Sequence, residues 1–243
     1  MGMTLVEPFQ IHSRKNGPAR ESLPKPITNA DVNVLRDLAT HLAGRPVPGV
    51  RMTEEEFDIW CDEDVRAEWI DGEVTLLSPA NIPHAELTFW LGRLLGAVVD
   101  VDDAGHVFTI DAQIRLAAIN QRRDPDVLFV SRARRKMIKD TYIDGAPDLV
   151  MEIVSPDSQV RDWKDKYDAY EKSGVREYWI IDPQPKRVEA FTVGRDKKFC
   201  PIKQVDGRIR SKVLKKLFIR PEWLFSSPLP KLAVVLKELG ARG

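Results

Sequence analysis

The residues of this sequence best suited to chemistry are two carboxylates in successive apolar segments. Asp126 follows Pro125 at the start of the apolar run 127–130, and Glu152 lies inside the next run, 149–154. Burying a carboxylate in an apolar strand is costly unless a partner stabilises its charge. If the two strands are neighbours, these side chains converge at one edge of a sheet, and a cation between them would offset their repulsion. Such hard oxygen ligands suit Mg²⁺ or Mn²⁺.

A metal ion held by two carboxylates can bind a phosphate oxygen and activate a water, the arrangement needed for phosphodiester hydrolysis. The period of two along the second run places Glu152 on one strand face with Asp148, and Met151 on the other. Asp148 is therefore a competing acid. Because it lies only four residues from Glu152 on the same face, we expect it to cap a loop or to support the ligands from outside the metal site.

Helices and a hairpin are predicted around these strands. Thr53 followed by three glutamates is typical of a helix start, and Asp71-Gly72 between apolar segments predicts a hairpin. Apolar residues at helical spacing predict a helix over 84–98. A further helix is expected over 162–172, closed by Gly174.

Alternating polar and apolar residues predict one strand over 107–116, and the segments 178–182 and 188–193 read as a strand pair. With the helices, this order indicates an α/β sandwich with a mostly central sheet. We expect three parts: an arm with one helix over 1–50, a compact domain over 51–193, and a basic extension over 194–243. The terminal helix of the extension can pack on the domain or on a partner.

Composition excludes several classes of protein. The 243 residues carry 37 basic and 37 acidic side chains, so the chain is neither a globally basic nucleic-acid coater nor an acidic disordered tail. The two cysteines, Cys61 and Cys200, match no metal-ligand spacing, so reduced thiols in the cytoplasm are expected. No apolar run predicts a membrane span, and the N-terminus lacks the pattern of a secretory signal.

Several segments together resemble the Uma-type family of restriction endonucleases, in the PD-(D/E)XK nuclease superfamily. The resemblance extends from about residue 51 to residue 193, about three-fifths of the chain. It implies a restriction-endonuclease-like α/β (α+β) fold, with a central mixed sheet flanked by helices. The segments that carry it are residues 68–73, Ser78-Pro79 with His84, 125–127, 145–156, Arg161-Asp162 with Lys166 and Tyr170, and 174–182.

The resemblance implies that Asp126 and Glu152 bind the metal ion, with the backbone carbonyl of Ile153 as a further ligand. The superfamily places a lysine two residues after the second acid, where this chain has Val154, which can neither polarise water nor neutralise a phosphate. A lysine on the following helix would replace it. Lys166 is the preferred candidate and Lys164 the alternative, whereas an exposed i,i+4 ion pair between Lys166 and Asp162 is the competing structural interpretation.

Other polar residues each have a functional and a structural interpretation. Glu68 completes the metal site or is a solvated carboxylate, and His84 contacts phosphate, assists proton transfer or simply opens a helix. Asp111 and Gln113 support the site from the polar face of their strand or are solvated there, and Tyr170 is expected in the core. The basic run between the two acidic strands grips a nucleic-acid backbone or is a solvated face; its members are Arg132, Arg134, Arg135 and Lys136.

The favoured function is a Mg²⁺-dependent endonuclease that acts on DNA, in which Lys166 orients or deprotonates water and stabilises the developing charge. A homodimer is expected because cleavage of both strands needs two sites. The alternative is a catalytically degenerate nuclease fold that binds nucleic acid or protein, which Val154 and the zero net charge favour.

Overall fold

The computed structural model describes residues 46–61, 65–77, 79–109, 112–155 and 161–240. They fall into two compact units, one built from residues up to 79 with 120–122, the other from 80–119 and from 123 onward. Within the described residues, no helix combines the length and the apolar character that a bilayer crossing requires.

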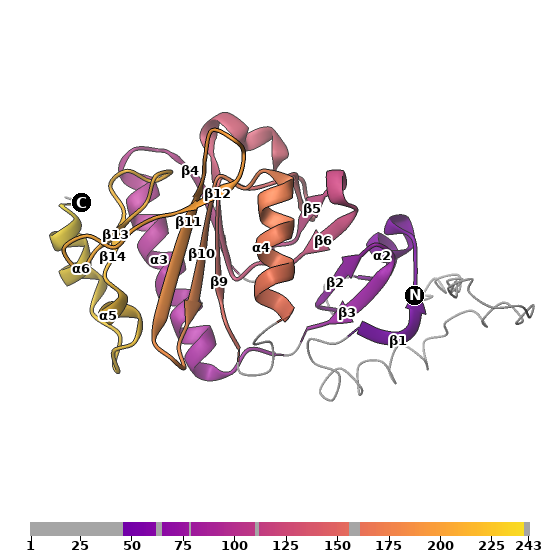
Figure 1. Cartoon of the computed structure of the whole chain (residues 1–243), viewed down its shortest axis with the longest axis horizontal. Coiled ribbons are helices and arrows are strands. Elements are labelled where there is room, and N and C mark those ends of the chain that lie inside the picture. Colours follow the sequence, from indigo (N-terminus) through magenta and orange to yellow (C-terminus); the bar gives the residue numbers. More distant parts are fainter. Residues whose placement is uncertain (1–45, 62–64, 78, 110–111, 156–160, 241–243) are drawn as a thin grey trace, which may run out of the picture. The chain divides into compact units, whose positions relative to one another are not determined.

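The first unit is a small antiparallel sheet with one helix (Figure 1). Strand order is β1-β3-β2-β6. Its elements are β1 (Pro46–Arg51), α2 (Glu54–Trp60), β2 (Ala67–Ile70), β3 (Glu73–Leu76) and β6 (Gln121–Arg123), the last residue of which belongs to the second unit.

Both local predictions for this unit are confirmed. Thr53 caps α2 in a reciprocal box: its hydroxyl accepts from Glu56 N at 3.2 Å, and Glu56 Oε2 accepts from Thr53 N at 2.8 Å. Asp71 and Gly72 both have positive φ, 50° and 88°, as a two-residue turn of type I′ requires. The turn joins β2 to β3 as the sequence indicates.

The second unit contains the central sheet, with strand order β12-β11-β10-β9-β7-β4. Only β9 and β10 run parallel, so the sheet is mixed, as predicted. The strands are β4 (Gly105–Thr109), β7 (Val127–Ser131), β9 (Leu149–Ile153), β10 (Glu177–Asp182), β11 (Arg187–Val193) and β12 (Phe199–Pro201). The helices are α3 (Ile82–Val101), α4 (Arg161–Ser173), α5 (Pro221–Leu224) and α6 (Leu232–Leu239), with the 3₁₀ turns η1 (Ala117–Ile119) and η2 (Arg132–Met137).

Different helices cover the two faces of this sheet, α3 on one side and α4 on the other (Figure 1). Met151 and Ile153 of β9 pack in the core with α3, whereas Val150 packs in the core with Tyr170 of α4. This division follows from the alternation of side chains along a strand. It confirms the predicted faces of the run that contains Glu152.

The single strand predicted over 107–116 is wrong. The structure has two strands there: β4 ends at Thr109 and pairs with β7, while β5 (Ile114–Leu116) pairs in parallel with β8 (Ile143–Asp144). Alternation reports which face a side chain occupies and carries no information about the partner strand, so it cannot reveal a change of partner within one run.

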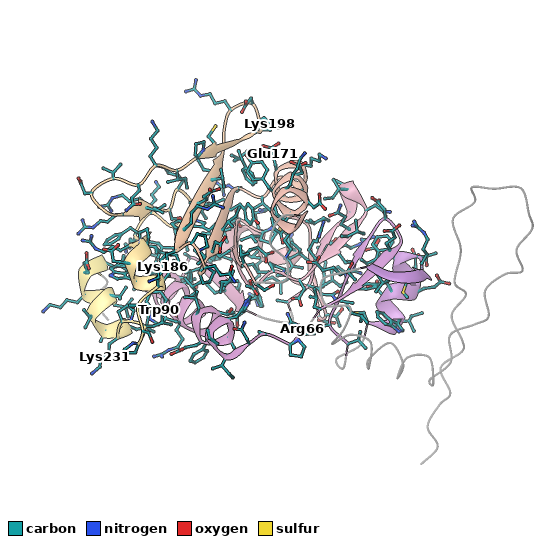
Figure 2. The ribbon with its side chains drawn as sticks, turned by 60° about the horizontal axis from the view of Figure 1, so that its bottom comes forward. Arg66, Trp90, Glu171, Lys186, Lys198 and Lys231 are labelled. Carbon is teal, nitrogen blue, oxygen red and sulfur yellow. The ribbon has the colours of Figure 1, made fainter. Side chains whose placement is uncertain are left out.

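Residues 194–240 are integrated into the second unit instead of forming a separate extension. Strand β12 continues the central sheet, β13 (Ile209–Arg210) and β14 (Phe218–Ile219) form a two-stranded ribbon, and Val235 of α6 is 1% exposed in the core with α3. The terminal helix therefore packs on the domain. Phe199 N and Lys198 Nζ both donate to Glu171 of α4, at 2.7 and 2.9 Å (Figure 2), and these bonds hold the pKa of Glu171 below its ordinary value.

Candidate active site

The two carboxylates lie at one end of neighbouring strands. β7 and β9 are antiparallel, with Val127 opposite Met151, and continuing this register by one residue sets Asp126 opposite Glu152. Glu152 alternates with core residues of the α3 face and so belongs to the α4 face of the sheet, whereas Asp126 lies just before β7, where its carboxylate reaches His84 of α3. Directly opposed residues have Cβ atoms about 5 Å apart, which is within bridging reach of one ion.

Asp126 is held by two hydrogen bonds. Its Oδ2 accepts from the backbone N–H of Ile153 at 2.7 Å, and its Oδ1 lies 2.8 Å from His84 Nε2. His84 stands in the first turn of α3, which Asn81 caps by accepting from His84 N at 3.0 Å. The structure thus brings His84 to the carboxylate, and the imidazole orients it.

Glu152 is 7% exposed and receives two donors from one helix. Lys166 Nζ lies 2.9 Å from Glu152 Oε2, and the hydroxyl of Tyr170 donates to Oε1 at 2.6 Å. Lys166 and Tyr170 are four residues apart on α4, so they share a face that points at the sheet. Lys164, two residues earlier, is exposed, and the side chain of Asp162 lies outside the described side chains.

The contact of Tyr170 with Glu152 was not predicted from the sequence. Tyr170 is buried in the core, as expected for an aromatic residue, but its hydroxyl also donates to the carboxylate. The available signal was its i,i+4 spacing from Lys166, because two residues at that spacing reach the same target.

The backbone beside the carboxylates offers one more oxygen. Ile153 directs its N–H toward Asp126, and a strand residue points its N–H and C=O to the same neighbour. In the register of β7 with β9, the residue opposite Ile153 is Pro125, which has no N–H to donate. The proline therefore leaves the Ile153 carbonyl without a ladder donor, so this oxygen and the two carboxylates form an oxygen donor set that fits Mg²⁺ or Mn²⁺.

Side chains alone do not complete this donor set. Within the described ranges, no three His, Cys, Asp or Glu side chains are grouped so as to hold a metal ion. The fit therefore depends on two carboxylates and one carbonyl.

Three further candidate residues are Glu68, Asp111 and Gln113. Glu68 is in β2 of the first unit, where it is 4% exposed, and its part in the site stays a prediction. Asp111 lies outside the described residues. Gln113 is half-buried, and its backbone carbonyl accepts from Ile143 N at 2.8 Å. The supporting role of its side chain also stays a prediction.

Asp148 has its own partners at the opposite end of β9. Its side chain is fully buried, accepts from Ser131 N at 2.8 Å and from Arg176 at 3.0 Å, and lies 3.4 Å from Arg134. Burial by itself raises the pKa of the Asp148 carboxyl, but the Ser131 N–H and the two guanidinium groups outweigh it and lower that pKa below 3.8. Asp148 thus anchors the loop before β9, which matches the loop-capping interpretation.

The basic run forms η2 after β7. Asp126 precedes β7, so the five residues of this strand, about 17 Å at about 3.3 Å per residue, separate the run from the carboxylates. Arg132 pairs with Asp103, Arg134 pairs with Asp148, and Arg135 and Lys136 are exposed. The run is not part of the carboxylate site, and its contact with nucleic acid stays a prediction.

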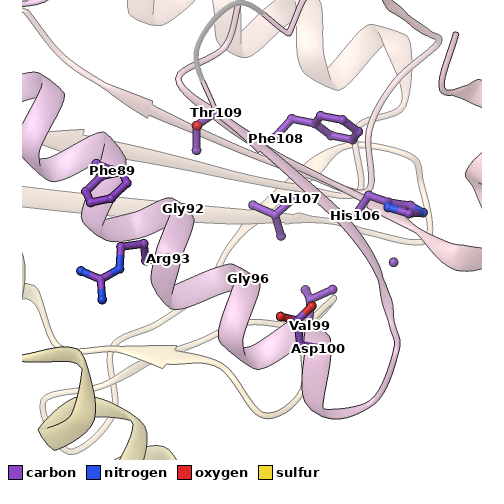
Figure 3. Close-up of a pocket in the computed structure, with 11 residues that line it drawn as sticks. Phe89, Gly92, Arg93, Gly96, Val99, Asp100, His106, Val107, Phe108 and Thr109 are labelled. Carbon is purple, nitrogen blue, oxygen red and sulfur yellow. The ribbon is translucent and has the colours of Figure 1, made fainter. Parts of the chain in front are cut away.

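A shallow hollow of about 410 Å³ lies between α3 and the edge strand β4 (Figure 3). Gly92 and Gly96 of α3 leave room for it, and Phe89 and Arg93 border it. It shares no lining residue with the carboxylate cluster.

Comparison with known proteins identifies the family of the chain. The sequence model of a family named Uma2, described as "Putative restriction endonuclease", matches residues 54–216, about two-thirds of the chain. The chain belongs to the Uma2 family. Uma2 membership supports a nuclease-like function and implies a nucleic-acid substrate.

Two individual proteins are similar to this Uma2 chain. The "Uncharacterized protein sll1609" of Synechocystis is 27% identical over 127 residues, which cover 52% of this chain and 71% of that protein. A crystal structure from Anabaena variabilis, described as "a putative nuclease belonging to DUF820", matches with a TM-score of 0.60 and 18% identity. It covers 72% of this chain and 97% of the other, and it establishes the fold.

Proposed function

We propose that this chain is a divalent-metal-dependent endonuclease that hydrolyses phosphodiester bonds of DNA. One observation carries the proposal. Asp126, Glu152 and the backbone carbonyl of Ile153 converge at one strand end, and Lys166 Nζ contacts the carboxylate of Glu152. These three oxygen donors would hold Mg²⁺ or Mn²⁺. When bound, such an ion supplies positive charge for a phosphate oxygen and lowers the pKa of a water molecule.

The side chains around the donors have distinct tasks in this proposal. Lys166, at 2.9 Å from Glu152, puts an ammonium where negative charge develops on the phosphate. His84 fixes the orientation of Asp126, and Tyr170 fixes that of Glu152. Val154, at the usual position of the superfamily lysine, makes no such contribution, and α4 supplies the ammonium instead.

The test is cleavage of single- and double-stranded DNA by the purified protein with Mg²⁺ or Mn²⁺, compared with chelator. Asp126→Asn and Glu152→Gln keep the side-chain shapes and remove the charges. We expect each to lower the rate by more than about 100-fold, the upper end for residues that only support a metal ligand. Asp140→Asn, at an exposed carboxylate, is the matched control. Unchanged cleavage in both site variants would refute the assignment.

A metal-independent binding module is the second candidate function. The observation in its favour is that Lys166 already neutralises Glu152 without any metal. Calorimetry with Mn²⁺ separates the two: no heat from the wild type, together with intact DNA binding, supports the binding module. Heat that disappears in Glu152→Gln supports the nuclease.

The assembly and location of the protein stay predictions. A twofold homodimer would supply one site for each strand of a duplex. Light scattering that gives the mass of a monomer, 27.6 kDa, would contradict it. A cytoplasmic location is expected from the reduced state proposed for Cys61 and Cys200.

A further inference from the structure

A pocket of about 390 Å³ adjoins the carboxylate site without including either carboxylate in its lining, and its volume falls within the size range of ligand pockets. His84, which bonds to Asp126, and Ile153, which follows Glu152, belong to its lining. The opposite wall comes from the turn after β10 and from residues 224–229, which comprise the last residue of α5 and the segment that follows it.

The lining of this pocket combines apolar and polar side chains. Leu87, Leu224, Phe225 and Leu229 supply the apolar surface. Amide and hydroxyl groups also line the pocket, from Asn81, Gln184, Ser226 and Ser227, together with the carboxylate of Glu86. The combination of an aromatic ring with side-chain amides and hydroxyls is the one by which proteins stack an unpaired base and read its edges.

An exposed ammonium completes the pocket. Lys186 lies in its lining, in the turn between β10 and β11, on the side of the molecule where Trp90 and the C-terminal segment also lie (Figure 2). A lysine beside an apolar pocket can bind a backbone phosphate while the attached base enters the pocket.

The wall formed by residues 224–229 belongs to the C-terminal part of the chain. These residues follow the stretch matched by the Uma2 model, which ends at residue 216. They are nevertheless held firmly, because Leu224 is 4% exposed in the core and Trp90 Nε1 donates to the carbonyl of Pro230 at 2.8 Å. The C-terminal segment thus adds a fixed wall beside a site that the family model covers.

From this geometry we infer that the pocket holds one unstacked nucleobase of the strand whose phosphate lies at Asp126 and Glu152. The inference rests on the proposed function, since the phosphate at the carboxylates brings the neighbouring nucleoside to His84 and Ile153. A base that enters this pocket has left its stack, so the substrate strand is single or locally opened there. Phe225 stacks on the base, and Gln184 reads its edge.

The test compares two strands of equal charge: a thymidine dodecanucleotide and a fully abasic strand of the same length. Binding is measured by fluorescence anisotropy with Ca²⁺ in place of Mg²⁺. One stacked base contributes about 1–3 kcal/mol, so the wild type should bind the thymidine strand about 10-fold more tightly. Phe225→Ala should reduce this ratio to about 2-fold, whereas Phe89→Ala, which removes an exposed ring elsewhere on α3, should leave it unchanged.

A second variant protects the test against misfolding of Phe225→Ala. Gln184 is exposed, and Gln184→Ala should keep the overall affinity while changing the order of preference among thymidine, cytidine and adenosine strands. Equal binding of the thymidine and abasic strands by the wild type, or a ratio unaffected by Phe225→Ala, would overturn the inference. Base-dependent binding that requires Phe225, without any cleavage in Mg²⁺ or Mn²⁺, would support the pocket and reject the proposed nuclease activity.

Discussion

Lys166→Met tests the central contact of the site. In the structure, Lys166 Nζ lies 2.9 Å from Glu152 Oε2, and the two side chains are 14% and 9% exposed. Methionine keeps the apolar stem and the helix propensity of lysine but removes the ammonium. The variant therefore leaves a nearly buried carboxylate without its positive partner, while the hydroxyl of Tyr170 still donates to it.

Removing one partner of a buried ion pair costs about 3–5 kcal/mol of the free energy of unfolding. Because both side chains keep some contact with water and a hydroxyl donor remains, we expect the lower end, about 3 kcal/mol. At about 2–4 °C for each kcal/mol, the melting temperature of the metal-free protein should fall by about 6–12 °C. Differential scanning calorimetry in chelator measures this fall.

In Mg²⁺, Lys166→Met should regain part of its stability but not its cleavage activity. Without the ammonium, the two carboxylates attract a divalent ion more strongly, so Mg²⁺ should bind about 10-fold more tightly, equivalent to about 1.4 kcal/mol of repulsion removed. The stability deficit of Lys166→Met should therefore narrow in Mg²⁺. Cleavage should nevertheless slow by about 100-fold, since the charge beside the phosphate is lost.

Lys164→Met is the matched control, because Lys164 is exposed on the same helix and the substitution is the same. A surface change of this kind should alter the free energy of unfolding by less than about 0.5 kcal/mol. Three results would refute the reasoning: an unchanged melting temperature for Lys166→Met, weaker Mg²⁺ binding by that variant, or loss of cleavage in Lys164→Met alone.

Three other predictions follow from single contacts. Tyr170→Phe keeps the buried ring but removes the 2.6 Å hydrogen bond to Glu152, and it should lower the free energy of unfolding in urea titrations by about 2 kcal/mol. An unchanged free energy of unfolding would mean that the hydroxyl does not contribute to stability. Asp148→Asn should cost about 2 kcal/mol at neutral pH. Because folding lowers the pKa of Asp148, the stability that its charge contributes is present above about pH 3.8 and is lost as the pH falls through the folded-state pKa. The difference in the free energy of unfolding between wild type and variant should therefore shrink in acid. A difference that stays constant with pH would argue against a role for the charge. Gly72→Ala forces a side chain into φ +88° with its Cβ 3.1 Å from Arg51, and thermal unfolding should show a loss of about 1 kcal/mol; a neutral result would mean that the turn rearranges.

Local features of the fold could be predicted from the sequence because their causes are local. The turn at Asp71-Gly72 needs two positive φ values, and the cap of α2 needs Thr53 and Glu56 three residues apart. Alternation likewise assigned the face of Glu152. Each of these features depends on residues within a few positions of one another, so the pattern and its cause appear together in the chain.

The candidate site could be predicted in part. The two carboxylates were identifiable from their places in successive apolar segments, and the lysine on the following helix from the family resemblance. The structure brings Lys166 to Glu152 and sets Asp126 opposite Glu152 in register. The bond between His84 and Asp126 joins residues 42 positions apart, and no local pattern specifies such a pair.

What the sequence by itself determined was the local elements, such as the Asp71-Gly72 turn, the cap of α2 and the face of β9 that carries Glu152. Only the tertiary structure decided which partners meet: that β4 and β5 separate into different pairings, that the hydroxyl of Tyr170 reaches Glu152, and that residues 224–229 wall a pocket beside His84. The physical reason is that such contacts form between segments far apart in the chain. Their energies depend on packing and burial, which exist only once those segments have come together.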